Sequence, residues 1–348
     1  MKIIVATTQV PFVRGGAEIH AEGLLDALRE AGYETELVTI PFKWYPPERI
    51  LDIMLASSLI DLSESCGEKI DRLIGLRFPA YLIPHPRKVI WLLHQHRQAY
   101  ELWGTPLGDL EHYPNGIQIR DTIINADNKV FREANQIFTN SKNVAKRLKK
   151  YNQVEGTPLY HPPKNADFFY CQNPCDYFFY PSRINPTKRQ ELIIYALKKT
   201  KSPFKVVFSG SADALDYKKR LEKLAEQLGI SNKVSFIGFV SEQEKRKLYA
   251  NSLGTIYCPY EEDYGYVTLE SMLSKKPILT CEDSGGPTEL IKDKETGLIV
   301  ENKAQAIADA METLWHHQSW SKHLGEQANE YYKSLNISWS TVVEKLTA

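Results

Sequence analysis

The sequence predicts an α/β protein made of two doubly wound, Rossmann-like units. Three observations support this fold class. Short apolar runs alternate with amphipathic stretches, an order typical of parallel sheets covered by helices. The alternation breaks near the middle of the chain at a proline-rich segment and then restarts. A length of 348 residues suits two domains that each bury a core of their own.

The first half opens with a buried strand and an amphipathic helix. Residues 2–7 are an apolar run. Residues 17–31 carry apolar side chains at helical spacing, Leu24 and Leu28 among them, before Gly32, a typical C-cap residue. The next elements continue the alternation, and we expect strands at 34–40, 88–93 and 134–139 and a helix capped by Ser141 that ends near residue 150.

The central break lies at residues 160–164, which read Tyr-His-Pro-Pro-Lys. A proline pair continues neither a helix nor a central strand, so we place the connection between the two units here. The expected division is an N-terminal Rossmann-like domain at 1–162, a linker at 163–176, a C-terminal Rossmann-like domain at 177–335 and a terminal segment at 336–348.

The second half repeats the alternation and then becomes helical. We expect strands at 177–181, 204–209, 234–237, 254–257, 277–280 and 297–300, and helices at 188–200, 216–228, 241–250, from about 265, at 286–291 and at 338–346.

Composition excludes several classes of protein. Lys plus Arg and Asp plus Glu both number 43, so the chain lacks the basic excess of a nucleic-acid binder. The sequence contains no 18-residue apolar run, so we expect no transmembrane helix. The N-terminus is not expected to be a signal peptide. The five scattered cysteines predict neither a disulfide framework nor a zinc site and favour a cytoplasmic location. The basic stretch at 142–150 fits a membrane contact or, more usually, a solvated helix face.

Glycines and cations follow the first strand of each half, and ligands of open α/β sheets bind beyond the carboxyl ends of strands. Gly15 and Gly16 open a helix, where glycine lets the backbone approach a phosphate, although a plain tight turn explains them equally well. Arg183 and Lys188 follow the first strand of the second half. Two cations at one sheet edge suit a diphosphate, although such residues are more often solvated surface charges.

The most informative segment runs from Glu262 to Glu270 and reads EDYGYVTLE. Gly265 permits a tight entry into a helix, whose first turn offers free amides to a phosphate. Carboxylates accept hydrogen bonds from paired hydroxyls, such as those of a ribose or a sugar ring. Acids placed for the helix dipole would explain Glu262 but not the whole pattern. The amides concerned belong to Tyr266, Val267 and Thr268.

Two glutamates separated by seven residues around a glycine resemble the EX7E signature of the retaining glycosyltransferases of family GT4, which have the GT-B fold. The resemblance covers most of the second half and parts of the first. It implies two facing domains with a deep cleft, the donor mainly on the second domain, the acceptor on the first, and a last helix that crosses back to the first domain. Further segments that are similar to the family lie at 15–18, 182–196, 236–240, 284–289 and 296–298.

The resemblance implies roles for the matching residues. Glu270 would bind the donor ribose, Glu262 would contact the donor sugar, and Arg183 with Lys188 would hold the diphosphate. His94 looks like the family's histidine near the reacting sugar, but a lone histidine is more often structural, and its neighbour His96 leaves the assignment open. The expected catalytic residues are His94, Arg183, Lys188 and Glu262; the expected donor contacts are Gly15, Gly16, Ser209, Gly210, Gly238, Phe239, Gly265, Tyr266, Val267, Thr268 and Glu270.

The chain departs from the family pattern in two places. Ser182 and Arg189 stand where the family often has glycine on either side of the Arg and Lys positions. The first glutamate is commonly preceded by Pro-Ser in the family, whereas here the sequence before it is Pro259, Tyr260 and Glu261. Glu261 could take the role of Glu262, but the seven-residue spacing favours Glu262.

The expected reaction moves a hexose from a UDP- or GDP-linked donor to a hydroxyl of a saccharide or lipid-linked saccharide, with retention. No Asp-x-Asp motif is present, so we expect no metal and no cofactor beyond the nucleotide-sugar substrate. Two alternatives remain: a nucleotide-sugar epimerase of the same fold and a non-catalytic nucleotide-sugar-binding protein.

The expected partners are the donor and the acceptor, without nucleic acid. The aromatic segment 41–47, with Trp103 and Tyr113, would stack on acceptor sugars or serve ordinary packing. A lipid-linked acceptor would bring a cytoplasmic protein into peripheral contact with the inner face of the membrane. The oligomeric state, the donor base and the acceptor linkage are not indicated.

Overall fold

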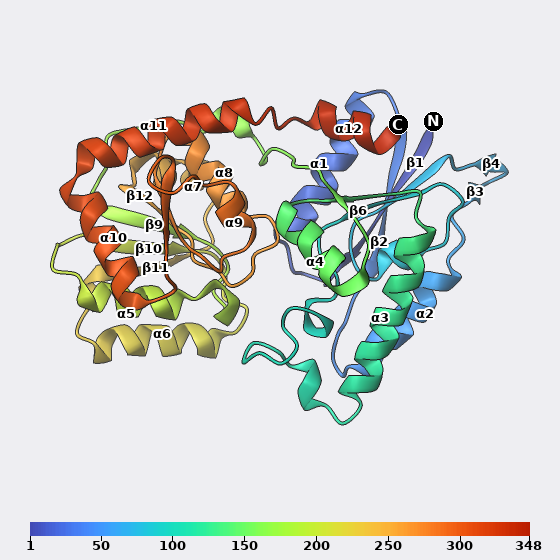
Figure 1. Cartoon of the computed structure of the whole chain (residues 1–348), viewed down its shortest axis with the longest axis horizontal. Helices are drawn as coiled ribbons and strands as arrows, with labels where there is room; N and C mark the ends of the chain where they lie inside the picture. Colours follow the sequence, from blue (N-terminus) through green and yellow to red (C-terminus); the bar gives the residue numbers. More distant parts are fainter. The chain divides into compact units, whose positions relative to one another are not determined.

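The computed structural model describes residues 1–348 as two compact units. Met1–Lys164 and Ile337–Ala348 form the first unit, and Asn165–Asn336 form the second. Each unit contains one six-stranded parallel sheet with helices packed around it (Figure 1). The last twelve residues of the chain therefore belong to the same unit as the first strand.

The sheet of the first unit has the order β2-β1-β5-β6-β7-β8, and all five pairings are parallel. Its strands are β1 Lys2–Gln9, β2 Glu34–Pro41, β5 Arg72–Gly75, β6 Lys88–Leu92, β7 Gln136–Thr139 and β8 Thr157–Pro158; β3 Glu64–Ser65 and β4 Glu68–Lys69 form a separate hairpin. The helices are α1 Gly16–Glu30, α2 Glu48–Leu59, α3 Gly116–Glu133, α4 Lys142–Asn152 and α12 Trp339–Thr347.

The central strand β5 has no counterpart among the expected strands. It spans only Arg72–Gly75, yet it pairs with β1 on one side and β6 on the other. Leu73 and Ile74 are fully buried there. Four residues are too few for periodicity to separate a buried strand from a loop. Helices α2 and α3 of the same unit were also not predicted.

The sheet of the second unit has the order β11-β10-β9-β12-β13-β14 and is also parallel throughout. Its strands are β9 Tyr177–Pro181, β10 Lys205–Ser209, β11 Val234–Gly238, β12 Gly254–Ile256, β13 Ile278–Cys281 and β14 Gly297–Val300. The helices are α5 Gln190–Lys199, α6 Leu215–Gln227, α7 Glu242–Asn251, α8 Tyr266–Leu273, α9 Gly286–Glu289, α10 Ala304–His316 and α11 Gln318–Ser334.

The segment that precedes β9 packs against the second unit. The Gln172 amide donates to the carbonyl of Ala250 at 3.0 Å, and the Cys175 amide donates to the carbonyl of Asn251 at 2.7 Å. The sequence suggested a linker at 163–176. Residues 163 and 164 belong to the first unit, whereas 165–176 belong to the second unit and are tied to α7.

An aromatic cluster attaches α12 to the first unit. Trp339 lies against Gly23 of α1, where an added Cβ would come within 2.5 Å of the indole Cζ2. The indole also contacts His161 and Trp91, with ring centroids 5.4 and 6.2 Å apart. His161 stacks on His20 at 4.3 Å. His161 lies just before the first connection between the units, and Trp339 lies just after the second. Both residues therefore belong to the same aromatic cluster.

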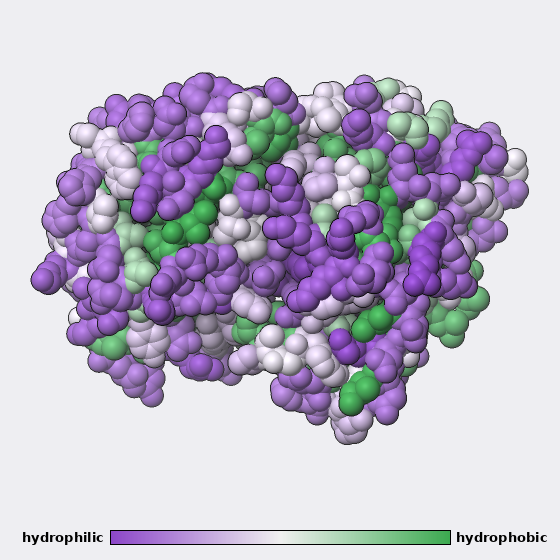
Figure 2. Space-filling model, in the orientation of Figure 1, coloured by the Kyte–Doolittle hydropathy of each residue, from purple (hydrophilic) through white to green (hydrophobic).

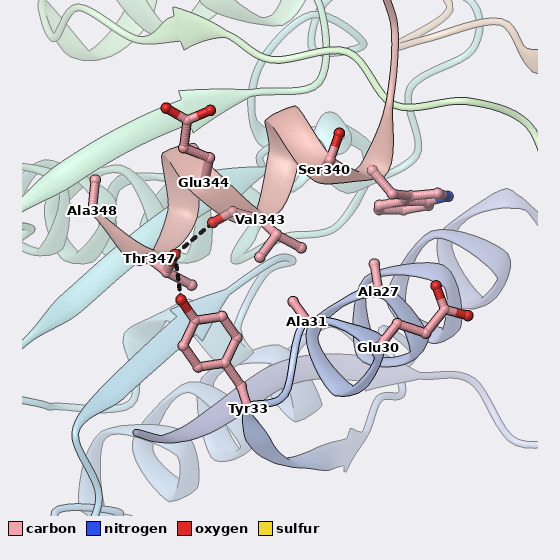
Figure 3. Close-up of a pocket in the computed structure, with 10 residues that line it drawn as sticks. Ala27, Glu30, Ala31, Tyr33, Ser340, Val343, Glu344, Thr347 and Ala348 are labelled. Carbon is pink, nitrogen blue, oxygen red and sulfur yellow. Dashed lines mark hydrogen bonds between the residues drawn. The ribbon is translucent and has the colours of Figure 1, made fainter.

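A pocket of about 610 Å³ lies beside this cluster, between α1, α12 and the start of β2 (Figure 3). Ala27, Ala31 and Val343 line it, and Tyr33 donates to the Thr347 hydroxyl at 3.3 Å across its end. Tyr33 directly precedes β2, so the pocket lies at the amino edge of the sheet. Ligands of open α/β sheets bind at the opposite edge.

The buried histidine predicts a dependence of stability on pH. Burial lowers the pKa of His20 from 6.5 to about 3, and burial also lowers the pKa of His161. Because the folded protein keeps these rings neutral, their contribution to stability is present above pH 6.5 and is lost as the pH falls below it. Each such histidine should lower the free energy of unfolding by about 1.4 kcal/mol between about pH 7.5 and about pH 5.5.

We expect His20→Phe to lose less stability over this interval than the native chain. Both ring nitrogens of His20 lack a hydrogen-bond partner, so an apolar ring removes a buried polar group. Urea denaturation at the two pH values measures the difference. The control is His323→Gln, at an exposed histidine of α11, which should leave the pH dependence unchanged. An equal loss in His20→Phe and the native chain would contradict the assignment.

Candidate functional site

The carboxyl edge of the second sheet brings together the polar residues that the sequence singled out. Strands β9, β12 and β13 are neighbours in the sheet, and the loops that follow them meet at this edge. The β9 loop carries Arg183 and Lys188, the β12 loop carries Glu262, and the β13 loop contains Gly285 and Gly286. Parallel pairing explains why residues so distant in sequence share one site.

Lys188 and Glu262 form an ion pair at the centre of this edge. The Lys188 ammonium donates to the Glu262 carboxylate and, at 3.0 Å, to the Tyr257 hydroxyl. The side chains of the ion pair are only 12% and 20% exposed, so the pair is largely shielded from water. Burial, together with the charge of Glu262, raises the pKa of Tyr257 well above its usual value. Tyr257 is therefore a neutral phenol beside a charged pair.

The Glu262 loop is held by backbone hydrogen bonds to the β13 loop. The amides of Glu261 and Glu262 donate to the carbonyls of Asp283 and Ser284 at 3.0 and 2.9 Å. The Gly286 amide donates back to the carbonyl of Glu262 at 2.8 Å. The segment before α8 therefore runs as a short parallel extension of the sheet, and the position of Glu262 is fixed by its main chain.

Gly265 produces the sharp turn from this loop into α8. Its φ is +87°, a left-handed conformation that favours glycine, and an added Cβ would lie 2.9 Å from Pro287 Cγ. The turn places the amides of Tyr266 and Val267 at the helix start, where a phosphate would be favoured. The sequence predicted that the Thr268 amide is also offered to a phosphate. In the structure this amide donates instead to the Gly265 carbonyl at 3.0 Å. The Thr268 hydroxyl is buried there without a hydrogen-bond partner.

Glu270 lies in a second charged group, separate from that of Glu262. Its two carboxylate oxygens accept hydrogen bonds from Lys245 at 2.7 Å and from the Tyr249 hydroxyl at 2.8 Å. Burial acts to lower the pKa of Lys245, but the charges of Glu270 and Glu242 outweigh it and raise the pKa overall. The two glutamates of the motif therefore have different cationic partners.

Lys245 and Tyr249 were not anticipated from the sequence. Both lie on α7, four residues apart, and so on one face of the helix. That spacing was visible in the sequence, but nothing in it indicated that this face meets α8. Burial, followed by the charge of Glu270, raises the pKa of Tyr249 well above its usual value, so it donates as a neutral phenol.

Arg183 occupies the same edge but has its own partner. Its guanidinium donates to both oxygens of Asp213 at 3.2 and 3.3 Å, and its side chain is 46% exposed. The two cations expected to share one anion thus bind different carboxylates here, Asp213 and Glu262. Asp213 lies between β10 and α6 and was not singled out in the sequence.

The loops after β10 and β11 contribute the remaining expected donor contacts of this unit. The Gly210 amide donates to the carbonyl of Gly238 at 2.8 Å, and the Ser209 hydroxyl donates to the same carbonyl at 3.4 Å. Phe239 follows directly and is 81% exposed. These residues stand at the carboxyl edge, beside the loop that carries Arg183.

The expected residues of the first unit lie at the carboxyl edge of its own sheet. Gly16 begins α1, and the Gly15 amide donates to the Glu18 carboxylate at 2.7 Å. His94 follows β6, and its Nδ1 lies 2.6 Å from the Gln95 carbonyl. His96 packs against Phe42 and Phe78, and burial lowers its pKa to about 3.

The structure shows no group of three or more His, Cys, Asp or Glu side chains arranged to hold a metal ion. No helix has the length and apolar character needed to cross a bilayer. The face of the molecule in Figure 2 is mainly hydrophilic, with scattered apolar patches.

Residues 173–331 match the family model described as glycosyl transferases group 1. The O-antigen chain mannosyltransferase C of Escherichia coli is 24% identical over 163 residues, which cover 46% of this chain and 42% of that protein. The alpha-1,3/1,6-mannosyltransferase ALG2 of Dictyostelium discoideum is 28% identical over 159 residues, 42% of this chain and 38% of that one. The matched regions span less than half the length of these two relatives.

Solved structures match over almost the whole chain. A sucrose-phosphate synthase from Thermosynechococcus elongatus has a TM-score of 0.80 at 16% identity, covering 99% of this chain and 97% of that one. HepE from Anabaena, in complex with UDP-glucose, has a TM-score of 0.73 at 16% identity, covering 99% and 98%. At such identities the similarity shows the fold, which is GT-B.

The pair formed by Glu270 and Lys245 generates a prediction for stability. Lys245→Met should lower the free energy of unfolding by about 3 kcal/mol, because it leaves a carboxylate buried without its cation. Adding Glu270→Gln should recover part of the loss, which urea denaturation of the three variants would measure as a coupling energy. The matched control is Lys218→Met, whose partner Glu222 is 44% exposed and whose loss should stay within about 0.5 kcal/mol. Strictly additive effects of the two substitutions would contradict this account.

Proposed function

We propose that the protein is a retaining hexosyltransferase of the GT4 type, because residues 173–331 match the model of glycosyl transferases group 1 and the chain has the GT-B fold. It moves a hexose from a UDP- or GDP-linked donor to a hydroxyl of a saccharide or lipid-linked saccharide. The observation that carries the proposal is the placement of Glu262 and Glu270 on either side of the α8 start, each beside a lysine.

This arrangement suits the three parts of a nucleotide sugar. Glu270 is rigidly held and offers its remaining lone pairs to the ribose hydroxyls. The start of α8 and the ammonium of Lys188 attract the diphosphate, and Arg183 adds a second cation at the same edge. Glu262 receives hydroxyls of the hexose. The seven residues between the two acids set the separation between the ribose and the sugar.

In the proposed reaction the bond between the anomeric carbon and the diphosphate oxygen breaks, and the acceptor oxygen bonds to that carbon on the same face. The acceptor proton passes to the leaving diphosphate. Negative charge grows on the diphosphate as the bond breaks, and Lys188 and Arg183 stabilise it electrostatically. These two cations take the place of a metal ion, so we expect turnover in the presence of EDTA. Gly16 remains a proposed donor contact, and His94 remains the proposed histidine near the reacting sugar.

The identity of the donor is best tested with the nucleotides and sugars that the names of the relatives suggest. Two of the relatives are described as mannosyltransferases, and one structural neighbour was solved with UDP-glucose. Because a ligand that binds only the folded state raises its stability, thermal shift with UDP, GDP and ADP identifies the base. Incubation with donor alone also tests the epimerase alternative, which would yield an isomerised sugar.

The acceptor side of the proposal rests on the loop between β2 and α2. Trp44 and Tyr45 are 37% and 54% exposed, and their rings meet edge to face at 5.3 Å. Phe42 anchors the loop, since it contacts the ring of His96 near the end of β6. Exposed, rigid aromatic rings at the edge that also carries His94 form a platform suited to a sugar ring. A lipid-linked acceptor would place the protein in the cytoplasm at the inner face of the membrane.

The first test of this proposal removes the central cation. With the donor that stabilises the native chain, Lys188→Met should lower kcat by roughly 100-fold, because the charge developing on the diphosphate loses its support. Glu262→Gln should lower kcat by a similar factor, because the hexose loses the carboxylate that orients it and Lys188 loses its charged partner. Transfer assays with radiolabelled UDP-glucose and GDP-mannose measure the rate, and thermal denaturation verifies folding. The control is Lys223→Met, at an exposed lysine of α6. Native-like turnover in both site variants would refute the assignment, and a pure binding protein would have no turnover to lose.

A second test concerns the acceptor platform. Trp44→Ala should raise the acceptor KM about tenfold, since roughly 1.4 kcal/mol of stacking is lost, and should leave the donor KM unchanged. Hydrolysis of the donor without acceptor serves as an internal reference that the substitution should not affect. Tyr195→Ala, an exposed tyrosine of α5 in the other unit, is the matched control. An unchanged KM for every saccharide that accepts the hexose would show that Trp44 has no part in acceptor binding.

A further inference from the structure

Arg189, the residue directly after Lys188, has an unusual backbone conformation. Its φ is +53°, in the left-handed region that favours glycine, and it stands at the N-cap of α5. A non-glycine residue in this region stores strain, which persists only where surrounding contacts compensate for it. The contacts of the Arg189 side chain are therefore informative.

The side chain makes a bidentate ion pair with Asp283. Two guanidinium nitrogens donate to the two carboxylate oxygens, each at 2.7 Å, and the amide of Asn302 donates to the same carboxylate at 2.7 Å. The guanidinium also lies 5.0 Å from the ring centroid of Tyr260. Burial acts to raise the pKa of Asp283, but the bonds from Arg189 and Asn302 outweigh it and lower the pKa overall. We call this pair the Arg189–Asp283 clasp.

The clasp connects the loops that carry the central ion pair of the site. Arg189 follows Lys188 on the β9 loop, and Asp283 lies on the β13 loop. The carbonyl of Asp283 accepts the amide of Glu261, next to Glu262. The Tyr260 amide donates to the carbonyl of Thr187 at 2.7 Å, on the other side of Lys188. The three loops thus form a closed ring of contacts around the Lys188–Glu262 pair.

We infer that the Arg189–Asp283 clasp is a positioning device that holds Lys188 and Glu262 in register for catalysis. The inference rests on the proposed transferase function. Neither member of the clasp is assigned to the substrate; each acts through the loop that it fixes. A displacement of about 1 Å between catalytic groups can lower a rate by roughly 100-fold. A tether that prevents such a displacement therefore affects turnover strongly, even though the clasp is partly exposed to solvent. Its side chains are 19% and 30% exposed.

The most informative substitution is Arg189→Gly. Glycine accepts a φ of +53° without strain, so the backbone is favoured while the clasp is removed. We expect kcat to fall at least tenfold, with the donor KM changing less than threefold and the melting temperature near that of the native chain. The charge exchange Arg189→Asp with Asp283→Arg should recover most of the kcat that either single change loses, because aspartate tolerates a positive φ.

Hydrogen–deuterium exchange gives a readout that does not depend on turnover. In Arg189→Gly, amides in the peptide covering residues 258–264 should exchange at least tenfold faster, while α10 and α11 stay protected as in the native chain. The charge exchange should restore protection. The control is Lys333→Ala, which removes the exposed ion pair with Glu330 in the same unit and should alter neither readout.

The outcomes separate the two claims. Unchanged exchange in 258–264, or a kcat within twofold of the native value in Arg189→Gly, overturns the clasp. A fall in kcat that merely follows a lowered melting temperature overturns it as well, since it reports general destabilisation. Absence of transfer by the native chain with UDP- and GDP-linked hexoses contradicts the proposed function. In that case hydrogen–deuterium exchange alone tests whether the clasp holds the Glu262 loop.

Discussion

The ion pair between Lys188 and Glu262 is the contact on which the candidate site depends. A largely buried ammonium or carboxylate costs free energy unless it is paired, so each of these side chains requires the other to be in place. The two residues are 74 positions apart and meet only because β9 and β12 pair in parallel. The chemistry of the site is therefore a consequence of sheet topology, and a change in strand order would leave two buried charges without partners.

The second acid follows the same rule with a different cation. Glu270 lies on a helix and takes both of its partners from α7, so its position is set by helix packing rather than by a loop. Glu262 lies in a loop whose main chain extends the sheet. A ligand that engages both acids would meet one rigid anchor and one position that depends on contacts between loops. That difference explains why the restraints around Glu262 are so numerous.

Local patterns in the sequence predicted most of the elements but few of the partners. The strand at 177–181 and the strand at 297–300 have the expected bounds, because apolar runs between turn residues are local signals. The spacing of Glu262 and Glu270 around Gly265 also depends only on neighbouring residues. The partners Lys245, Asp213 and Asp283 did not emerge, since each is brought into place by pairing between distant elements. The strand β5 was missed for a related reason: four buried residues carry too little periodicity to identify a strand.

The departure at Arg189 shows how a mismatch with a family pattern acquires a physical meaning. The backbone at this position has the left-handed conformation that glycine adopts most easily, yet the chain has a long cation there. Its guanidinium reaches Asp283 on the β13 loop and lies near the ring of Tyr260, which stands in the segment before Glu262 where the chain departs from the family's usual Pro-Ser. The two departures are therefore in contact with each other. The less favourable backbone at Arg189 is thus compensated by contacts of its own side chain, which joins the loops of the site.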